Sequence, residues 1–401
     1  MAVGQTKLLR FPDIHGSQVV FTYGGDLWLV ATSGGTAQRL TAHPGQELFA
    51  RFSPDGEWIA FTGQYDGDEQ VYIVPTAGGA PTQLTFYPAR GPLPQRWGYD
   101  NQVYGWSPDG SAVLFRSMRY GYDLSGTRLF LAPVDGGLAR PLPMPEAGTA
   151  GLSPDGSKVV YSPLVRDFRA WKRYQGGWAQ ELYIFDLASH DMERVTDHPR
   201  ADRDPMWIGD KIYFTSDRDG RNNIYAYDTV TKATRQLTEH DPWDVRWPGD
   251  DGDSRIIYEL NGELQVYDIS AGSARPLTIN VPDDGLWKRS SRIAVGDQVS
   301  DWALSPKGER ALFVARGDVF TAPIEKGPTR NLTRSSDAHD KWARWSPDGS
   351  KIAFISDMSG EEEIYLINQD GSGEIEQLTS NGGEMRYALT WSPDGERIAF
   401  S

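Results

Sequence analysis

The chain has 401 residues, of which 40 are Lys or Arg and 55 are Asp or Glu, so its formal net charge is −15 at pH 7. This acidic balance argues against nucleic acid or an anionic membrane surface as the main partner, and the absence of cysteine excludes a disulfide framework, a thiol nucleophile and a cysteine-based zinc site. No apolar run approaches the roughly 20 residues of a membrane span, and residues 1–10 contain no apolar segment of signal-peptide length, so the sequence predicts a cytoplasmic protein.

The first elements that the sequence predicts are two sets of four short strands. The first set begins at a Pro-Asp-Ile-His-Gly turn, residues 12–16, and ends at Thr41. In the second set, residues 53–56 read Ser-Pro-Asp-Gly between the strand-forming segments 48–52 and 58–61. Proline presets φ at the second turn position, Ser and Asp can bond nearby backbone amides, and glycine accepts the left-handed conformation. The pattern predicts a tight hairpin, and further short strands complete a four-stranded unit at Thr85.

The Ser-Pro-Asp-Gly turn recurs along the chain. Copies occupy residues 107–110, 153–156, 346–349 and 392–395, with a Ser-Pro-Lys-Gly variant at 305–308. Neighbouring copies are separated by 54 (53 to 107), 46 (107 to 153), 41 (305 to 346) and 46 (346 to 392) residues. These spacings fall around the length of one β-propeller blade. Because a four-stranded blade cannot bury both of its faces alone, the units are predicted to pack radially.

The middle of the chain completes six units. A long connection at 86–102 precedes the third unit. The fourth unit contains an insertion, because 25 residues (157–181) separate its turn from its next strand, against 14 (57–70) in the second unit. The fifth and sixth units replace the turn with Trp-Ile-Gly-Asp and Trp-Pro-Gly-Asp, respectively. The repeat pattern then lapses at 280–287, which predicts a boundary between two domains.

The remaining residues predict the beginning of a second propeller. A seventh unit runs from 305 to 333 and an eighth from 346 to 379, whereas the ninth stops at Ser401 after its second strand. Since a chain that halts inside a repeat leaves strand edges unpaired, we expect a fragment of a longer protein. The predicted fold class is all-β, with a six-bladed β-propeller at 1–281 and, at 282–401, the start of a second β-propeller that is truncated after its third repeat begins.

The sequence contains no catalytic constellation. No Gly-x-Ser-x-Gly elbow, His-Glu-x-x-His helix or phosphate loop occurs. The six histidines are scattered through turns and connections, at positions 15, 43, 190, 198, 240 and 339. Segment 217–223 resembles a calcium loop but lacks the distal bidentate glutamate, so a hairpin turn is the better interpretation. We therefore predict no catalytic residue, no cofactor and no metal ion for these residues.

Two sets of basic residues are candidates for ligand contact. The insertion at 166–178 interleaves cations with aromatic residues. Because the overall charge opposes nucleic acid, a packed insertion on one propeller face is the first interpretation, and a channel or partner contact is the second. The connections that enter the innermost strands form one rim of a propeller, where function commonly resides. These connections carry Arg90, Arg96, Arg200 and Arg203, although most rim arginines are merely solvated.

Three segments resemble the N-terminal half of a tricorn-type protease. They are Pro-Asp-Ile-His-Gly at 12–16, Asp-Leu-Trp at 26–28 and Trp-Lys-Arg-Tyr-Gln-Gly-Gly at 171–177. The resemblance covers the whole chain, although the Ser-Pro-Asp-Gly repeat is shared with Tol-translocation and prolyl-oligopeptidase-like propellers. In the tricorn family a six-bladed propeller precedes a seven-bladed one, followed by a PDZ domain and a serine peptidase core. The resemblance implies that the second propeller is seven-bladed and that the parent protein is a cytoplasmic, oligomeric serine peptidase whose propellers are gated passages for peptides.

The resemblance also implies where functional residues lie. The family's catalytic serine, histidine and acidic residue belong to its C-terminal core, so none can be placed on this chain, and whether the chain is itself an enzyme stays open. The first propeller of the family carries an adjacent arginine pair, ahead of the third repeat turn, that holds the C-terminal carboxylate of a peptide. With a one-residue shift the matching position here reads Gln95-Arg96. We expect Arg96 and Gln95 to bind substrate, with one arginine in place of two.

The preferred function is the non-catalytic propeller region of a tricorn-like peptidase, for substrate gating and passage. Its expected partners are peptides and further copies of the full-length protein. Two alternatives stay open: a protein-interaction propeller of the Tol-translocation kind, and the gating propeller of a prolyl-oligopeptidase-like enzyme. Peptide preference, subunit number and the way in which the first propeller closes do not follow from the sequence.

Overall fold

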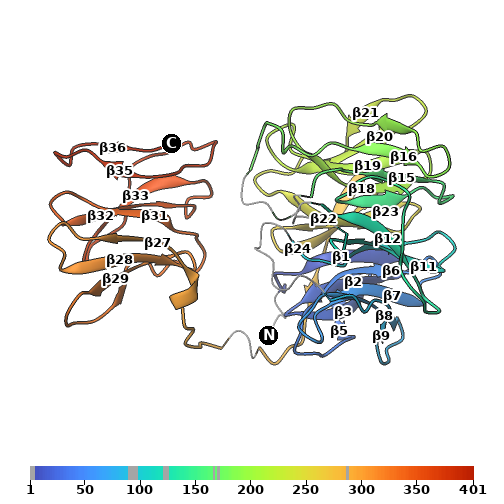
Figure 1. The fold of residues 1–401 in the computed structure, drawn as a ribbon, viewed down its shortest axis with the longest axis horizontal. Helices are drawn as coiled ribbons and strands as arrows, with labels where there is room; N and C mark the ends of the chain where they lie inside the picture. The colour runs from blue at the N-terminus through green and yellow to red at the C-terminus, as the bar shows by residue number, and fades with distance from the viewer. Residues whose placement is uncertain (1–4, 89–97, 121–125, 166–167, 169–171, 286–288) are drawn as a thin grey trace. The chain divides into compact units, whose positions relative to one another are not determined.

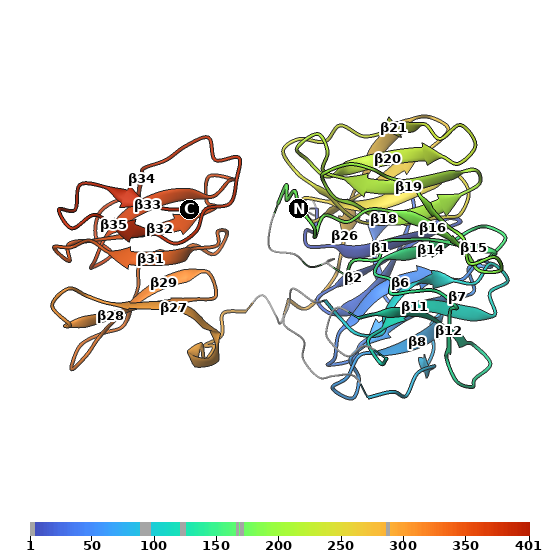
Figure 2. The same cartoon turned by 45° about the horizontal axis from the view of Figure 1, so that its top comes forward.

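The computed structural model describes residues 5–88, 98–120, 126–165, 168, 172–285 and 289–401. The chain forms two compact units, Met1–Trp287 and Lys288–Ser401, and both consist of small antiparallel sheets (Figures 1 and 2). Among the described residues, the first unit has six four-stranded sheets, and the second has two four-stranded sheets and one two-stranded sheet. The predicted all-β fold of propeller blades is therefore confirmed.

Each four-stranded sheet of the first unit is one blade, and its strands follow one another in sequence. The first three blades are β1 (Arg10–His15), β2 (Gln18–Tyr23), β3 (Asp26–Ala31) and β5 (Gln38–Arg39); β6 (Glu47–Phe52), β7 (Trp58–Gly63), β8 (Gln70–Pro75) and β9 (Thr82–Gln83); and β10 (Gln102–Trp106), β11 (Ala112–Ser117), β12 (Arg128–Pro133) and β13 (Arg140–Pro141). The next three blades are β14 (Ala150–Leu152), β15 (Lys158–Tyr161), β16 (Tyr183–Asp186) and β17 (Met192–Arg194); β18 (Asp202–Ile208), β19 (Lys211–Ser216), β20 (Asn223–Asp228) and β21 (Thr234–Gln236); and β22 (Val245–Asp250), β23 (Arg255–Leu260), β24 (Glu263–Asp268) and β25 (Ser273–Leu277).

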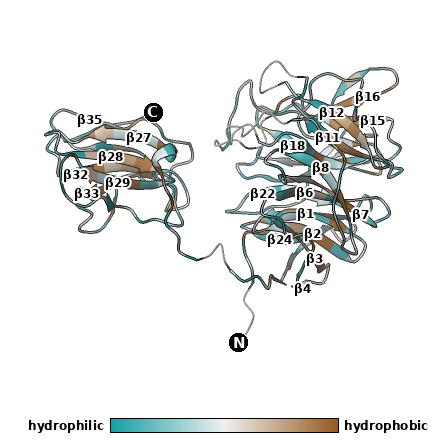
Figure 3. Ribbon diagram, turned by 60° about the horizontal axis from the view of Figure 1, so that its bottom comes forward, coloured by the Kyte–Doolittle hydropathy of each residue, from teal (hydrophilic) through white to brown (hydrophobic). Residues whose placement is uncertain are grey.

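The six blades close into a ring. Each innermost strand contacts the innermost strand of the next blade, from β1 through β6, β10, β14 and β18 to β22, and β22 contacts β1. Hydrophobic residues lie along the strands of each unit, as Figure 3 shows, and clusters of buried side chains span neighbouring blades, such as Phe115 with Val71 and Tyr225 with Val160. Burial of apolar faces between blades is therefore what joins these short sheets.

The repeated turn has the geometry that its sequence predicts. The Ser53 hydroxyl donates to a carboxylate oxygen of Asp55, and it accepts the backbone N–H of Trp58 at 2.9 Å. The same Asp55 oxygen accepts the N–H of Glu57 at 3.0 Å. Gly56 has a φ of +74°, a left-handed conformation that glycine adopts without steric cost. The hairpin is thus specified by contacts within five residues along the chain.

A threonine at the end of the outermost strand anchors most blades. In the second blade, the Thr85 hydroxyl accepts the N–H of Val71 at 2.9 Å and donates to the side chain of Gln70 at 2.7 Å. A threonine accepts a backbone N–H at the start of the adjacent strand in the same way at positions 41, 196, 238, 333 and 379. The Leu-Thr dipeptide that ends most of these repeats, or Val-Thr at 195–196, therefore anchors the outermost strand to its neighbour.

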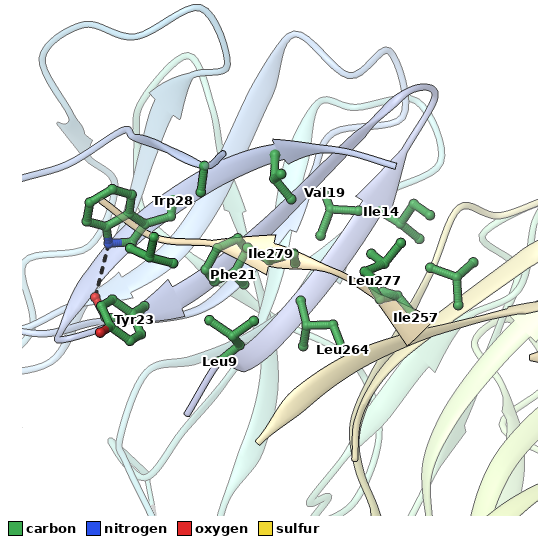
Figure 4. Packing of buried hydrophobic residues seen from close by; sticks show 14 residues of the cluster. Leu9, Ile14, Val19, Phe21, Tyr23, Trp28, Ile257, Leu264, Leu277 and Ile279 are labelled. Carbon is green, nitrogen blue, oxygen red and sulfur yellow. Dashed lines mark hydrogen bonds between the residues drawn. The ribbon is translucent and has the colours of Figure 1, made fainter. Parts of the chain in front are cut away.

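In the described part of the chain, the first and sixth blades each contain only strands that follow one another in sequence, so the ring closes without exchange of strands between them. Instead β26 (Ile279–Asn280), which follows the sixth blade, pairs in parallel with β4 (Gly35–Thr36) of the first blade. The backbone N–H of Thr6 also donates to the Ile279 carbonyl at 2.9 Å. A shared buried cluster lies behind this clasp, and Figure 4 shows Leu264 and Ile279 packed among residues of β1 and β2. Closure therefore combines a short β-clasp with apolar packing.

The second unit repeats the same architecture. After a 3₁₀ turn, η3 (Gly296–Gln298), its strands are β27 (Val299–Leu304), β28 (Arg310–Ala315), β29 (Asp318–Pro323) and β30 (Arg330–Asn331); β31 (Lys341–Trp345), β32 (Lys351–Ser356), β33 (Glu363–Asn368) and β34 (Glu376–Gln377); and β35 (Thr390–Trp391) with β36 (Ile398–Ala399). The seventh and eighth predicted repeats thus form whole blades, and the described part of the ninth forms a two-stranded sheet.

Candidate functional site

The innermost strands of the first unit surround a cavity of about 310 Å³, to which all six blades contribute. Its lining includes the aromatic residues Phe11, Phe49, Tyr104, Trp106 and Trp247 together with several carboxylates. A volume of this size lies at the lower end of the roughly 300–1,000 Å³ that small-molecule sites occupy. The cavity is therefore the candidate functional site of the first unit.

Three aromatic side chains converge at this cavity because their strands are bulged at the same place. The registers of β1, β6 and β22 each shift where Phe11, Phe49 and Trp247 lie, and these residues have φ values of +50°, +56° and +48°. The ring centroids of Phe11 and Phe49 are 4.4 Å apart, and those of Phe11 and Trp247 are 4.9 Å apart. A β-bulge redirects side chains in this way, and the result is an aromatic neck formed by these three residues.

Two further aromatic residues pack on the neck. The ring of Phe168 lies 4.8 Å from that of Trp247, and the ring of Tyr99 lies 5.7 Å from that of Phe49. Phe168 belongs to the predicted insertion, and Tyr99 belongs to the long connection before the third blade. Both interpretations of the insertion, packing and a channel contact, are compatible with this position.

Arg51 joins the innermost strands of four blades. Its guanidinium donates to the carbonyl oxygens of Pro12 in the first blade at 3.1 Å, Tyr104 in the third at 3.3 Å and Pro248 in the sixth at 3.2 Å. These carbonyls belong to strands whose inner edges have no neighbouring strand to pair with, so their oxygens need another donor. One side chain of the second blade therefore supplies donors to a large part of the ring.

Two carboxylates lie beside this arginine at the junction of the first and sixth blades. Asp13 accepts the N–H of Phe52 at 2.8 Å, and its other oxygen lies 3.9 Å from Arg51 Nη1. Asp250 accepts the N–H of Gly252 at 2.9 Å. Burial raises the pKa of Asp13 to about 7 and that of Asp250 to about 6, and the positive charge of Arg51 opposes both shifts. Asp13 and Asp250 are thus two buried carboxylates whose ionisation Arg51 favours.

The sequence-predicted site residues are only partly brought together. Gln95, Arg96 and Arg90 lie outside the described residues. Arg200 donates to the Arg173 carbonyl at 2.9 Å, and Arg203 is paired with Asp204, which lines the cavity, at 3.2 Å. Among the described residues, no group of three or more His, Asp or Glu side chains is placed to hold a metal ion.

Sequence reasoning missed Arg51, Asp13 and the aromatic neck. One signal was available for Arg51, because the corresponding position before the repeat turn is Gly105 in the third blade and Gly151 in the fourth. The eighth repeat also has an arginine at this position, Arg344, so the residue marks two of the repeats and not one blade alone. The described segments also contain no helix with the length and hydrophobicity that crossing a membrane takes.

A closed ring of six blades around an axial cavity defines the first unit as a β-propeller domain. The family model described as the tricorn protease N-terminal beta propeller domain matches residues 6–273, and the chain belongs to this family. The resemblance that we drew from three sequence segments is therefore confirmed.

Full-length relatives agree with this assignment. Tricorn protease homolog 1 of Streptomyces coelicolor is 29% identical over 371 residues, covering 90% of this chain and 33% of that protein. The tricorn protease of Thermoplasma acidophilum is 25% identical over 385 residues, covering 94% and 34%. A crystal structure of the tricorn protease matches with a TM-score of 0.63 at 23% identity, covering 98% of this chain and 37% of that one, and shows the shared fold. The chain spans about a third of the length of these relatives.

Proposed function

We propose that the chain is the non-catalytic propeller region of a tricorn-like serine peptidase, in which the first unit gives peptides a gated passage along its axis. The observation that carries the proposal is the axial cavity that all six blades line, narrowed by the aromatic neck. The peptidase activity is that of the tricorn protease relatives and belongs to those proteins as wholes. In this chain the propeller would select and conduct peptides for a catalytic core elsewhere.

The junction between the first and sixth blades favours axial passage over lateral opening. Besides the β26–β4 clasp, Arg255 donates to the Gly16 carbonyl at 2.7 Å, and Arg275 donates to the Thr32 carbonyl at 2.7 Å across the same junction. The buried cluster that spans the junction adds apolar packing. Parting these blades would break all three kinds of contact at once, so a peptide would pass through the ring without opening it.

The wider setting of the proposal is a cytoplasmic homo-oligomer acting on peptides. The tricorn family supports this setting, and the acidic composition argues against nucleic acid or an anionic membrane as the main partner. The 401-residue chain should by itself leave short fluorogenic peptides uncleaved, since its sequence contains no recognisable nucleophile and base. If the purified chain hydrolyses these peptides and a serine-directed inhibitor abolishes the activity, the proposal that this region is non-catalytic is wrong.

Obstruction of the cavity tests the passage directly. Gly105 lines the cavity, and a Cβ atom there would meet no atom within 4 Å, so Gly105→Trp should add an indole ring without forcing the backbone apart. In the full-length enzyme this variant should lower kcat if products leave by this route, or kcat/KM if substrates enter by it. Gly383→Trp is the matched control, because that glycine is exposed and also has open space at Cβ. Unchanged kinetics for both variants would show that peptides do not use the cavity.

Carboxylate recognition by Arg96, with Gln95 beside it, remains part of the proposal. A guanidinium can meet a carboxylate with two charge-assisted hydrogen bonds. In the full-length enzyme, Arg96→Glu should raise KM for peptides with a free C-terminus and leave amidated peptides nearly unaffected. An equal effect on both peptide classes, or none on either, would show that Arg96 does not bind the peptide carboxylate and is an ordinary solvated arginine.

A further inference from the structure

The carboxylates that line the axial cavity differ in how well they are compensated. Asp251 is paired with Arg255 at 2.7 Å, and Asp204 is paired with Arg203 and accepts the Thr215 hydroxyl at 2.7 Å. These groups already have a positive partner. A ligand cation would therefore gain little from binding either of them.

Among the residues that the structure describes, Asp13 and Asp250 have no such partner at hydrogen-bonding distance. The nearest guanidinium nitrogen of Arg51 is 3.9 Å from Asp13, because that side chain is directed at three backbone carbonyls of neighbouring blades. Asp250 is half-buried at the cavity wall, and its carboxylate accepts a hydrogen bond from the backbone N–H of Gly252. Burial raises the pKa values of both groups, and the positive charge of Arg51 offsets these shifts only in part.

The two carboxylates belong to one place in the cavity. A Cβ atom on Gly249 would come within 2.5 Å of Asp13 Oδ1, so the Asp13 carboxylate lies directly against the residue that precedes Asp250. The glycine is what lets β22 approach β1 so closely, since any side chain there would displace the carboxylate. The cavity wall thus presents two closely placed acidic groups from two blades.

Unpartnered polar atoms also occur where the cavity is lined. Trp247 is 9% exposed and Thr149 is 3% exposed, both line the cavity, and neither the indole Nε1 nor the threonine hydroxyl has a hydrogen-bond partner among the described residues. A buried donor without a partner costs free energy, which a ligand carbonyl could recover. The rings of Phe11 and Phe49 beside Trp247 would accommodate an apolar side chain.

These groups match the amino-terminal end of a short peptide, which has an ammonium group, a first side chain and a first carbonyl within a few ångströms. Resting on the proposed function, we propose that the axial cavity of the first unit binds the free amino terminus of short peptides, with Asp13 and Asp250 holding the ammonium group and the aromatic neck holding the first side chain. This would make the passage selective for peptides with an unblocked amino terminus.

Calorimetric titration of the 401-residue protein at pH 7 and low salt tests the site with three probes. They are Leu-Gly-Gly, its N-acetyl form and its C-terminal amide. Acetylation should weaken binding about tenfold or more, the loss expected for a charge-assisted contact, whereas amidation should leave it unchanged. Because these comparisons use the unaltered protein, they do not depend on any variant folding.

Two isosteric variants identify the residue. Asp250→Asn should remove the preference for the free amino group while leaving affinity for the acetylated peptide unchanged. Asp253→Asn is the control, since it neutralises an exposed carboxylate of the same turn that does not line the cavity. Equal binding of the free and acetylated peptides, or an unaltered preference in Asp250→Asn, would refute the proposed ammonium-binding site. Neither result would contradict the proposed axial passage. Absence of binding by all three peptides up to about 10 mM would overturn both.

Discussion

Replacement of Arg51 by methionine should destabilise the first unit through two separable effects. The variant leaves the carbonyl oxygens of Pro12, Tyr104 and Pro248 without their donor, and it leaves Asp13 without the nearest positive charge. Removal of one partner of a buried ion pair typically costs about 3–5 kcal/mol. Because a cavity of about 310 Å³ has room for water that can bond the freed carbonyls, we expect the lower end, about 3 kcal/mol. For a unit of this size that corresponds to a fall in Tm of roughly 6–12 °C.

The two effects differ in their dependence on pH. The pKa of Asp13 in the folded protein, about 7, lies above its ordinary value of 3.8, so its ionisation opposes folding. The stability that protonation preserves is fully present below about pH 4 and is lost as the pH rises through about 7. Without Arg51 the pKa should rise further, and the stability deficit of Arg51→Met should therefore grow between pH 5 and pH 8. The loss of the hydrogen bonds to the three carbonyls should contribute equally to the stability deficit at pH 5 and at pH 8.

Thermal denaturation followed by calorimetry across this pH range measures the two effects, and two companion variants separate them. Arg51→Lys keeps a positive charge near Asp13 but cannot supply the same fork of donors, so its deficit should depend little on pH. Asp13→Asn combined with Arg51→Met should recover part of the stability at pH 8, because the buried carboxylate of Asp13 is removed, although that of Asp250 remains. A deficit in Arg51→Met that is constant with pH, together with a double variant no more stable than the single one, would refute this account.

Three further predictions concern the blades and their connections. Thr238→Val should cost about 1–3 kcal/mol in thermal denaturation, because the N–H of Ile224 and the side chain of Asn223 lose their shared partner. Gly34 and Gly35 have φ values of +82° and +115°, so alanine strains the backbone at either position. Gly34→Ala should nevertheless accelerate amide exchange in β26 more than Gly35→Ala does, because a Cβ atom at position 34 would also lie 2.5 Å from the Thr278 carbonyl oxygen, whereas one at position 35 meets nothing within 4 Å; equal exchange in the two variants would contradict this account. We propose domain limits of 1–281 and 282–401, so limited proteolysis should release a stable piece ending between residues 280 and 292, and a first stable cut within the fourth to sixth blades would contradict those limits.

The repeated elements could be predicted because their interactions are local. The turn at Ser53–Gly56 is made by hydrogen bonds between residues no more than five positions apart, and the threonine anchors act within one repeat, 14 positions apart at Val71 and Thr85. Turn chemistry and strand alternation therefore determined the hairpins, the blades and the all-β class without reference to the rest of the chain. The same local patterns carried the resemblance to the tricorn family.

The ring closure and the axial cavity were decided by tertiary structure. Arg51 bonds the Pro248 carbonyl across 197 positions, and β26 pairs with β4 across more than 240 positions, so no local pattern specifies either contact. Phe49 belongs to a segment that the sequence predicts only as a strand, and the bulge in β6 is what brings its side chain to Phe11 and Trp247. Asp13 looks like an ordinary turn residue in the sequence, and only the approach of β22, made possible by Gly249, buries it beside Asp250. Such contacts depend on how many blades form and on how they meet, because closing a ring brings together residues that periodicity alone leaves unrelated.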